Sequence, residues 1–421
     1  GSAAAGQRCG MRRIDPAVVV VLAGVSAALH VGKLPPALPV LRDALSLTLV
    51  QAGFLLSLVQ LAGMTLGLLA GLTADGIGLR RSMLGGLLLL GVASAAGGWA
   101  QDASSLMALR AVEGAGFLLA AMPAPSLIRR LVPPAQMDAT LGLWGAYMPL
   151  GTALALLVGP VVMAVSGWQA WWLGLACVSF GMALWVWRTV PADAPVVTRG
   201  DAPAALRLPD RLRLTLGAPG PWLVALSFAM YSGQWLAVIG FLPSIYAQAS
   251  VPGGLAAVLT ALAAAANIVG NIASGRLLQR GAAPQKLLYL GFAVMGLGAW
   301  MAFSMGVPWG TTTRYLAVLL FSMVGGMIPA TLFSLSVRLA PDAGTVSTTV
   351  GWMHQCSALG QFLGPPAVAW VAGVAGGWHW TWVVTGICCL FGIGLARGMA
   401  EALARDRLES GAAPTPRQDT T

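Results

Sequence analysis

The segment around which this chain is built reads Gly71-Leu-Thr-Ala-Asp75-Gly-Ile-Gly78-Leu-Arg80-Arg81. It separates two apolar runs, roughly residues 50–70 and 82–99, each long enough to cross a bilayer as a helix. Its glycines permit a sharp turn, and Asp75 stands where we expect the next helix to begin and to need a cap. The arginine pair favours the cytoplasmic face. The segment therefore predicts a tight cytoplasmic loop between two membrane-spanning helices.

The composition excludes a soluble protein. Of 421 residues, 57% are hydrophobic and only 9% are charged, whereas soluble domains carry about a quarter charged residues. The net charge of +10 does not indicate nucleic-acid binding, because 20 of the 24 Lys and Arg residues fall on one set of alternate loops and termini. Arg42 and Arg314 fall on the other side, and Lys33 and Arg110 lie within spans. This bias predicts cytoplasmic termini.

Apolar runs of about twenty residues predict twelve membrane-spanning helices. The first run continues too far for the core of a signal peptide. The expected spans are residues 16–40, 50–70, 82–99, 104–127, 139–165, 168–188, 221–247, 254–275, 286–306, 313–337, 345–374 and 378–399. The expected organisation is a cytoplasmic N-terminal tail (1–15), a six-helix bundle (16–188), a cytoplasmic linker (189–220), a second six-helix bundle (221–399) and a cytoplasmic tail (400–421).

The loop segment resembles the loop 2–3 signature of the major facilitator superfamily. Five residues stand at signature positions, namely Gly71, Asp75, Gly78, Arg80 and Arg81. Thr73 and Gly76 depart from the signature, and Gly76 removes an Arg that often joins its charge relay. The resemblance implies that the five matching residues form a conformational latch that holds the cytoplasmic side closed in one state.

Further motifs carry the same resemblance. The run from Arg110 to Gly116 resembles the family's helix 4 motif, and Gly151 with Gly159-Pro160 matches the antiporter motif of helix 5 in part. Residues 125–130 and 141–146 are similar to the cyanate/2-nitroimidazole transporter group. The resemblance implies an all-α integral membrane fold of twelve helices in two pseudo-symmetric six-helix bundles, which rock about a midplane site. It also implies a monomeric secondary transporter in the bacterial inner membrane.

Ionisable residues within spans are candidates for function because they are costly there. His30 and Lys33 are three apart, so they share one face of helix 1, just before Pro35-Pro36. We expect this face to line the central cavity, where Lys33 with His30 attracts an anionic substrate. The alternative is that Lys33 snorkels to the outer interface.

Arg110 and Glu113 are also three apart, on helix 4, and predict an intrahelical ion pair. As a functional pair they would couple protons, because protonation of Glu113 releases Arg110 to bind an anion. As a structural pair they would only brace helix 4.

Uncharged polar residues on other helices complete the candidate substrate site. They are Tyr147, Tyr231, Gln234, Asn267, His354 and Gln355. They are able to supply hydrogen bonds and an aromatic wall, although such residues also serve as packing contacts between helices. His354 titrates near neutral pH when unperturbed and is a candidate pH sensor; a buried His satisfied by a carbonyl is the alternative.

These residues predict a proton-coupled, alternating-access transporter of a small organic or inorganic anion. The alternative function is proton-antiport efflux of a drug-like compound. No Walker P-loop is present, which disfavours ATP-driven transport, and the scattered histidines do not form the constellation that an enzyme requires. The expected partners are the substrate, protons and the lipid bilayer; no cofactor and no metal are expected.

Overall fold

The computed structural model describes residues 15–133, 140, 143–193, 207–305 and 310–409; the side chains of residues 70–77, 343 and 406–409 lie outside this description. Throughout the described ranges the secondary structure is helical, and eleven helices are long and apolar enough to span a membrane. One of them, α9 (Tyr147–Thr189), has 43 residues and is interrupted at Gly167, where φ is 79°. Glycine adopts this backbone conformation readily, so α9 contributes two spans and the expected total of twelve is confirmed.

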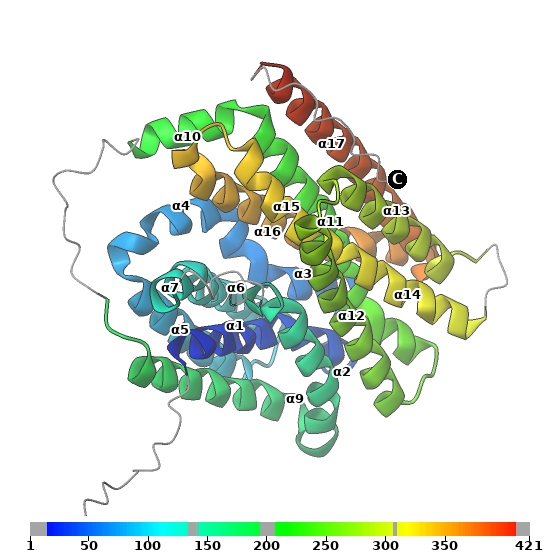
Figure 1. Cartoon of the computed structure of the whole chain (residues 1–421). Helices are drawn as coiled ribbons and strands as arrows, with labels where there is room; N and C mark the ends of the chain where they lie inside the picture. The colour runs from blue at the N-terminus through cyan, green and yellow to red at the C-terminus, as the bar shows by residue number, and fades with distance from the viewer. Residues whose placement is uncertain (1–14, 134–139, 141–142, 194–206, 306–309, 410–421) are drawn as a thin grey trace, which may run out of the picture.

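The N-terminal half contains the first six spans (Figure 1). In chain order its helices are α1 (Pro16–Gly32), α2 (Leu34–Leu45), α3 (Leu49–Ser57), the 3-10 turn η1 (Leu58–Gln60), α4 (Leu61–Ile77), α5 (Leu79–Gly97), α6 (Ala103–Ala121), α7 (Ala124–Leu131) and α9.

The C-terminal half contains the other six spans. Its helices are α11 (Pro219–Gln248), α12 (Gly253–Gln279), α13 (Pro284–Phe303), α14 (Thr311–Gly325), α15 (Met327–Leu339), α16 (Val346–Ala375) and α17 (Thr381–Glu409). Two differences from the expected boundaries emerge. The linker contains a short helix, α10 (Leu208–Gly217), and α17 continues about ten residues into the predicted tail.

Proline explains the break in the first span. Pro35 and Pro36 carry no N–H, so the carbonyls of Val31 and Gly32 lose their usual donors four residues ahead. The span accordingly divides at Lys33 into α1 and α2. Backbone carbonyls freed inside a membrane must find other donors.

The loop after α4 corrects the expectation for Asp75. Helix α4 continues through Asp75 to Ile77, so Asp75 does not precede the first turn of α5. Instead, the carboxylate of Asp193 accepts hydrogen bonds from the N–H groups of Arg80 (3.0 Å) and Arg81 (3.1 Å). A residue that follows the sixth span therefore caps the third.

The two halves meet along α16 and also where α12 packs against α9. Helix α16 packs against α11 of its own half and against α3 and α4 of the other half (Figure 1). At one end of the molecule, Leu38 and Leu56 of the N-terminal half share a buried cluster with Phe241 and Ala369 of the C-terminal half. This apolar cluster closes that end of the interface.

Candidate functional site

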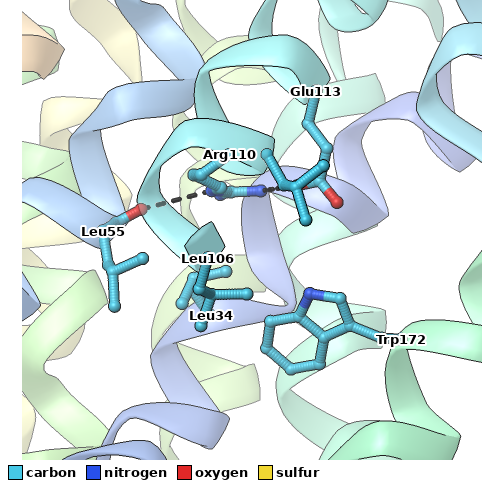
Figure 2. Close-up of a pocket in the computed structure, with 7 residues that line it drawn as sticks. Leu34, Leu55, Leu106, Arg110, Glu113 and Trp172 are labelled. Carbon is cyan, nitrogen blue, oxygen red and sulfur yellow. Dashed lines mark hydrogen bonds and ion pairs between the residues drawn. The ribbon is translucent and has the colours of Figure 1, made fainter. Parts of the chain in front are cut away.

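The predicted pair on helix α6 is present and belongs to a larger buried cluster. Arg110 Nη1 lies 2.7 Å from Glu113 Oε2, and the Lys33 ammonium hydrogen-bonds the other oxygen of the same carboxylate. The three side chains are at most 2% exposed. Figure 2 shows the Arg110–Glu113 contact with Leu34, Leu55, Leu106 and Trp172 around it. Glu113 thus joins two cations from different helices.

Lys33 points into the N-terminal half. Its ammonium donates to Ser94 Oγ at 3.0 Å and lies 4.7 Å from the centroid of the Trp172 ring. Trp171 donates to the Lys33 carbonyl at 3.3 Å. Ser94 belongs to α5 and both tryptophans to α9. Lys33 does not snorkel to the interface, since its side chain is fully buried.

His30 lies beside the same carboxylate. Its Nε2 hydrogen-bonds Ser179 Oγ at 2.7 Å, and its Nδ1 lies 3.9 Å from Glu113 Oε1. The ring is fully buried. His30 and Lys33, which the sequence places on one face of the first span, therefore both approach Glu113.

Arg110 also holds the broken helices together. Its guanidinium donates to the carbonyls of His30 and Val31, the latter at 3.4 Å, and to the carbonyl of Leu55 at 3.2 Å. Val31 is one of the residues whose carbonyl loses its donor to Pro35-Pro36, and Leu55 lies just before the 3-10 turn η1. Arg110 thus supplies donors where the helical hydrogen-bond pattern is interrupted.

The cluster carries a formal surplus of one positive charge, because Lys33 and Arg110 face a single carboxylate when His30 is neutral. Buried charges are strongly unfavourable unless they are paired. The arrangement therefore suits either a nearby anion or a proton-dependent change in charge. Among the described residues, no group of three or more His, Cys, Asp or Glu is placed to hold a metal ion.

An open cavity lies between the halves. Its walls come from η1, α4, α6, α7, α9 and α16. The lining residues are Gln60, Gly63, Gly67, Phe117, Leu118, Ala121, Met122, Pro125, Trp144, Tyr147, Met148, His354, Ser357, Ala358 and Gln361. None of them is Lys, Arg, Asp or Glu, so the part of the wall formed by described residues is polar in places but carries no fixed charge.

The candidate substrate residues are distributed over three places. Tyr147 and His354 line the cavity, whereas His30, Lys33 and Arg110 belong to the charged cluster. The third group consists of residues that hold helices together: Gln355 accepts from Leu68 N (2.9 Å), Asn267 donates to Tyr231 Oη (2.8 Å), and Gln234 donates to the Met230 carbonyl (3.0 Å). The structure thus separates residues that the sequence analysis grouped as one site.

Among the lining residues with hydrogen-bonding side chains, the sequence analysis did not assign Gln60, Trp144, Ser357 and Gln361 to the site. Gln60 is an amide in the middle of an apolar run, and that position is the signal that could have identified it. Trp144, Ser357 and Gln361 occur among other small, aromatic or polar residues, where nothing in the sequence tells which way they point.

The loop residues are described in part. The side chains of Gly71 and Asp75 lie outside the described part of the chain. Gly78 has a φ of 94°, and a Cβ there would lie 2.5 Å from Asp193 Oδ2. Arg80 donates to the Trp187 carbonyl at the end of α9, and the Arg81 side chain is exposed. Within the described residues, the contacts of this loop lead to the sixth span.

Two helical halves, a first span that is broken at Lys33 and a cavity between the halves define a multi-pass membrane transporter. The chain belongs to the major facilitator superfamily, whose family pattern matches residues 18–358. Members of this family are transporters, which bind small-molecule substrates and are not enzymes.

The chain is similar to the cyanate transport protein CynX of Escherichia coli K12, with 24% identity over 387 residues that cover 88% of this chain and 93% of the relative. It is 32% identical over 219 residues to the 2-nitroimidazole transporter of the same organism, covering 50% of this chain and 52% of the relative. These similarities support the group suggested by the motifs.

Two further comparisons concern drug resistance and fold. The chain is 31% identical over 220 residues to the methylenomycin A resistance protein of Streptomyces coelicolor, covering 50% of this chain and 42% of that protein. It therefore spans less than half the length of that relative. The solved structure of a bacterial Spinster homologue, inward-facing and unoccupied, matches with a TM-score of 0.77 at 14% identity, over 95% of this chain and 98% of that chain. This last match demonstrates the fold alone.

Proposed function

We propose that this protein is a proton-coupled secondary transporter of a small organic or inorganic anion. The observation that carries the proposal is the buried cluster in which Lys33 and Arg110 share the single carboxylate of Glu113. The cavity wall includes Phe117, one turn along α6 from Glu113. A surplus positive charge inside a medium of low dielectric constant attracts an anion in this cavity more strongly than it would in water.

Protonation of Glu113 would strengthen that attraction. It neutralises the only carboxylate of the cluster, so the formal surplus rises from one positive charge to two. Proton binding and anion binding would then favour each other, and linkage requires the effect to be reciprocal. If the two halves change between their inward-facing and outward-facing states only with both ligands bound or with neither, each anion is transported together with a proton.

Orientation and assembly are part of the proposal. The excess of Lys and Arg on one set of loops supports cytoplasmic termini in a bacterial inner membrane. A monomer is sufficient, because the cavity is formed by the two halves of one chain. The similarity to a cyanate transport protein over most of both chains supports a small anion as substrate.

The test uses sealed proteoliposomes that contain the purified full chain and an internal pH dye. Addition of external cyanate or a panel of small carboxylates is expected to acidify the lumen. In Glu113→Gln, anion exchange is expected to persist without acidification, whereas the exposed Glu401→Gln serves as the matched control and leaves acidification unchanged. Glu113→Gln leaves two buried cations unpaired and raises the formal charge of the cluster. The Lys33→Met/Glu113→Gln double variant therefore provides a second test, because it keeps the formal charge of the cluster at its wild-type value. Unchanged acidification in both variants would remove Glu113 from coupling.

A second function, proton-antiport efflux of a drug-like compound, is favoured by the aromatic cavity wall without fixed charge. The similarity to a Streptomyces resistance protein supports the same function. In the same liposomes, efflux predicts no response to anions. It predicts instead that a lipophilic amine makes the lumen more alkaline than it does in empty liposomes.

A further inference from the structure

The polar groups of the cavity form a continuous hydrogen-bonding edge that joins the two halves. Gln60 of η1 donates to Gln361 Oε1 of α16 at 3.0 Å, and Gln361 donates to Ser357 Oγ at 3.3 Å. Each amide nitrogen carries two N–H groups and uses one of them in this chain of bonds. Both amides therefore keep donors for a ligand that lies against this edge.

Aromatic rings form another part of the same cavity. Trp144, which precedes α9, and Tyr147, the first residue of α9, are stacked, with ring centroids 4.2 Å apart and an angle of 14° between their planes. His354 comes from α16, in the C-terminal half, and its ring lies 6.1 Å from Phe228 and 5.4 Å from Phe333, centroid to centroid. Within the described residues, no hydrogen bond engages the His354 imidazole, so its nitrogens remain usable by a ligand.

A flat ring suits such a cavity better than a small spherical ion does. Aromatic rings attract one another in offset-stacked or edge-to-face arrangements, and the Trp144–Tyr147 pair offers a wall for either. The free N–H groups of Gln60 and Gln361 favour a ligand whose hydrogen-bonding groups lie in the plane of its ring. The surplus positive charge of the Lys33–Arg110–Glu113 cluster favours an anionic form of that ligand.

We propose that this cavity selects planar, conjugated organic acids, whose ring packs against Trp144 and Tyr147 and whose carboxylate bonds Gln60 and Gln361. The proposal rests on the proposed anion transport and narrows it to one class of anion. It also assigns recognition to Gln60 and Gln361. Because Gln60 and Gln361 come from different halves, a ligand bound to the free N–H groups of both amides contacts both halves at once.

The test is equilibrium binding of tritiated benzoate to the purified full chain in detergent, measured by scintillation proximity and needing no transport. Unlabelled benzoate is expected to compete at least about five-fold better than unlabelled cyclohexanecarboxylate, because the saturated ring loses the aromatic contact. Trp144→Leu is expected to weaken benzoate binding about five-fold, and Gln60→Leu about ten-fold. Tyr147→Leu and Gln361→Leu provide second variants at each wall if the first do not fold.

The matched controls are Trp370→Leu, which replaces a 61% exposed tryptophan on α16, and Gln101→Leu on an exposed loop; both are expected to bind benzoate normally. Equal competition by benzoate and cyclohexanecarboxylate would overturn the planar site but leave anion transport intact. If neutral benzamide competes as strongly as benzoate, the cavity recognises the planar ring, but the proposed preference for acids is overturned. The absence of benzoate binding would overturn the inference.

Discussion

Lys33 is the residue that gives the buried cluster its surplus charge. Its ammonium contacts Glu113 of α6, Ser94 of α5 and the ring of Trp172 of α9. Without Lys33, Arg110 and Glu113 would form a neutral pair. Without Glu113, two cations would remain buried and unpaired.

We therefore predict that Lys33→Met is tolerated better than Glu113→Gln. Breaking a buried pair by removal of one partner costs about 3–5 kcal/mol when it leaves an uncompensated charge, and only Glu113→Gln increases the surplus. Thermal unfolding in one detergent, followed by tryptophan fluorescence, measures the difference. The midpoint is expected to fall in the order wild type, Lys33→Met, Glu113→Gln. A midpoint for Lys33→Met at or below that of Glu113→Gln would contradict this account of the charge.

The short loop between α4 and α5 depends on one conformation and one distant cap. Gly78 has a φ of 94°, and Asp193 accepts hydrogen bonds from the first free N–H groups of α5. The space beside Gly78 is filled by the same carboxylate. A side chain at this position would be disfavoured both by its backbone conformation and by collision with Asp193.

A double-mutant cycle separates these two effects. Asp193→Ala alone is expected to cost about 1 kcal/mol, as the loss of a helix cap does. Gly78→Ala alone should cost more, because strain and collision add. In the Asp193→Ala background, Gly78→Ala should cost less than it does alone but still more than zero, since the positive φ remains. Urea titration of helical content provides the free energies, and additive effects would show that the carboxylate and the glycine do not interact.

Helix α6 illustrates how a short motif acquires its partners. The spacing of Arg110 and Glu113 predicts their pairing, because residues three apart on a helix are neighbours. The same spacing cannot predict that Arg110 also reaches His30, Val31 and Leu55. Those carbonyls are available because α1 and α3 end where they do, which is a property of two other spans.

Across the whole molecule, glycines set how closely the two halves approach. A Cβ at Gly53 of α3 would lie 2.9 Å from Pro366 Cα of α16, and one at Gly63 would lie 2.9 Å from Ala358 Cβ. The contact at Gly53 involves backbone that cannot move aside as a side chain can. It lies near the apolar cluster that closes one end of the interface.

Gly53→Val is therefore expected to open that end. The measurement is the rate at which a membrane-impermeant thiol reagent labels Leu38→Cys, a fully buried position of the cluster, in a variant without native cysteines. Labelling should accelerate several-fold in Gly53→Val. Gly85→Val is the matched control, since a Cβ there meets nothing within 4 Å, and it should leave the rate unchanged. Equal rates in the two variants would exclude Gly53 as a determinant of closure.

Much of this molecule can be predicted from residue types and their order. Apolar runs of membrane length specify the spans, and Gly, Asp and Arg in the loop after α4 mark the family. The orientation that the placement of Arg and Lys predicts stays a prediction. The pairing of Arg110 with Glu113 is equally local. These features depend on hydrophobic transfer and on helical spacing, both of which operate within a few turns of one chain segment.

The division of the polar residues into two sites depends instead on contacts between distant segments. Lys33 meets Glu113, and Gln60 meets Gln361, across 80 and 301 positions of sequence. Asp193 takes the capping role expected of Asp75 in the same way, across 113 positions. Helix packing rotates each side chain toward the cavity, toward a neighbouring helix or toward lipid, and a rotation of one helix by a third of a turn would exchange these surroundings. The charged cluster and the uncharged cavity are therefore products of tertiary packing, whereas the spans that carry them follow from composition.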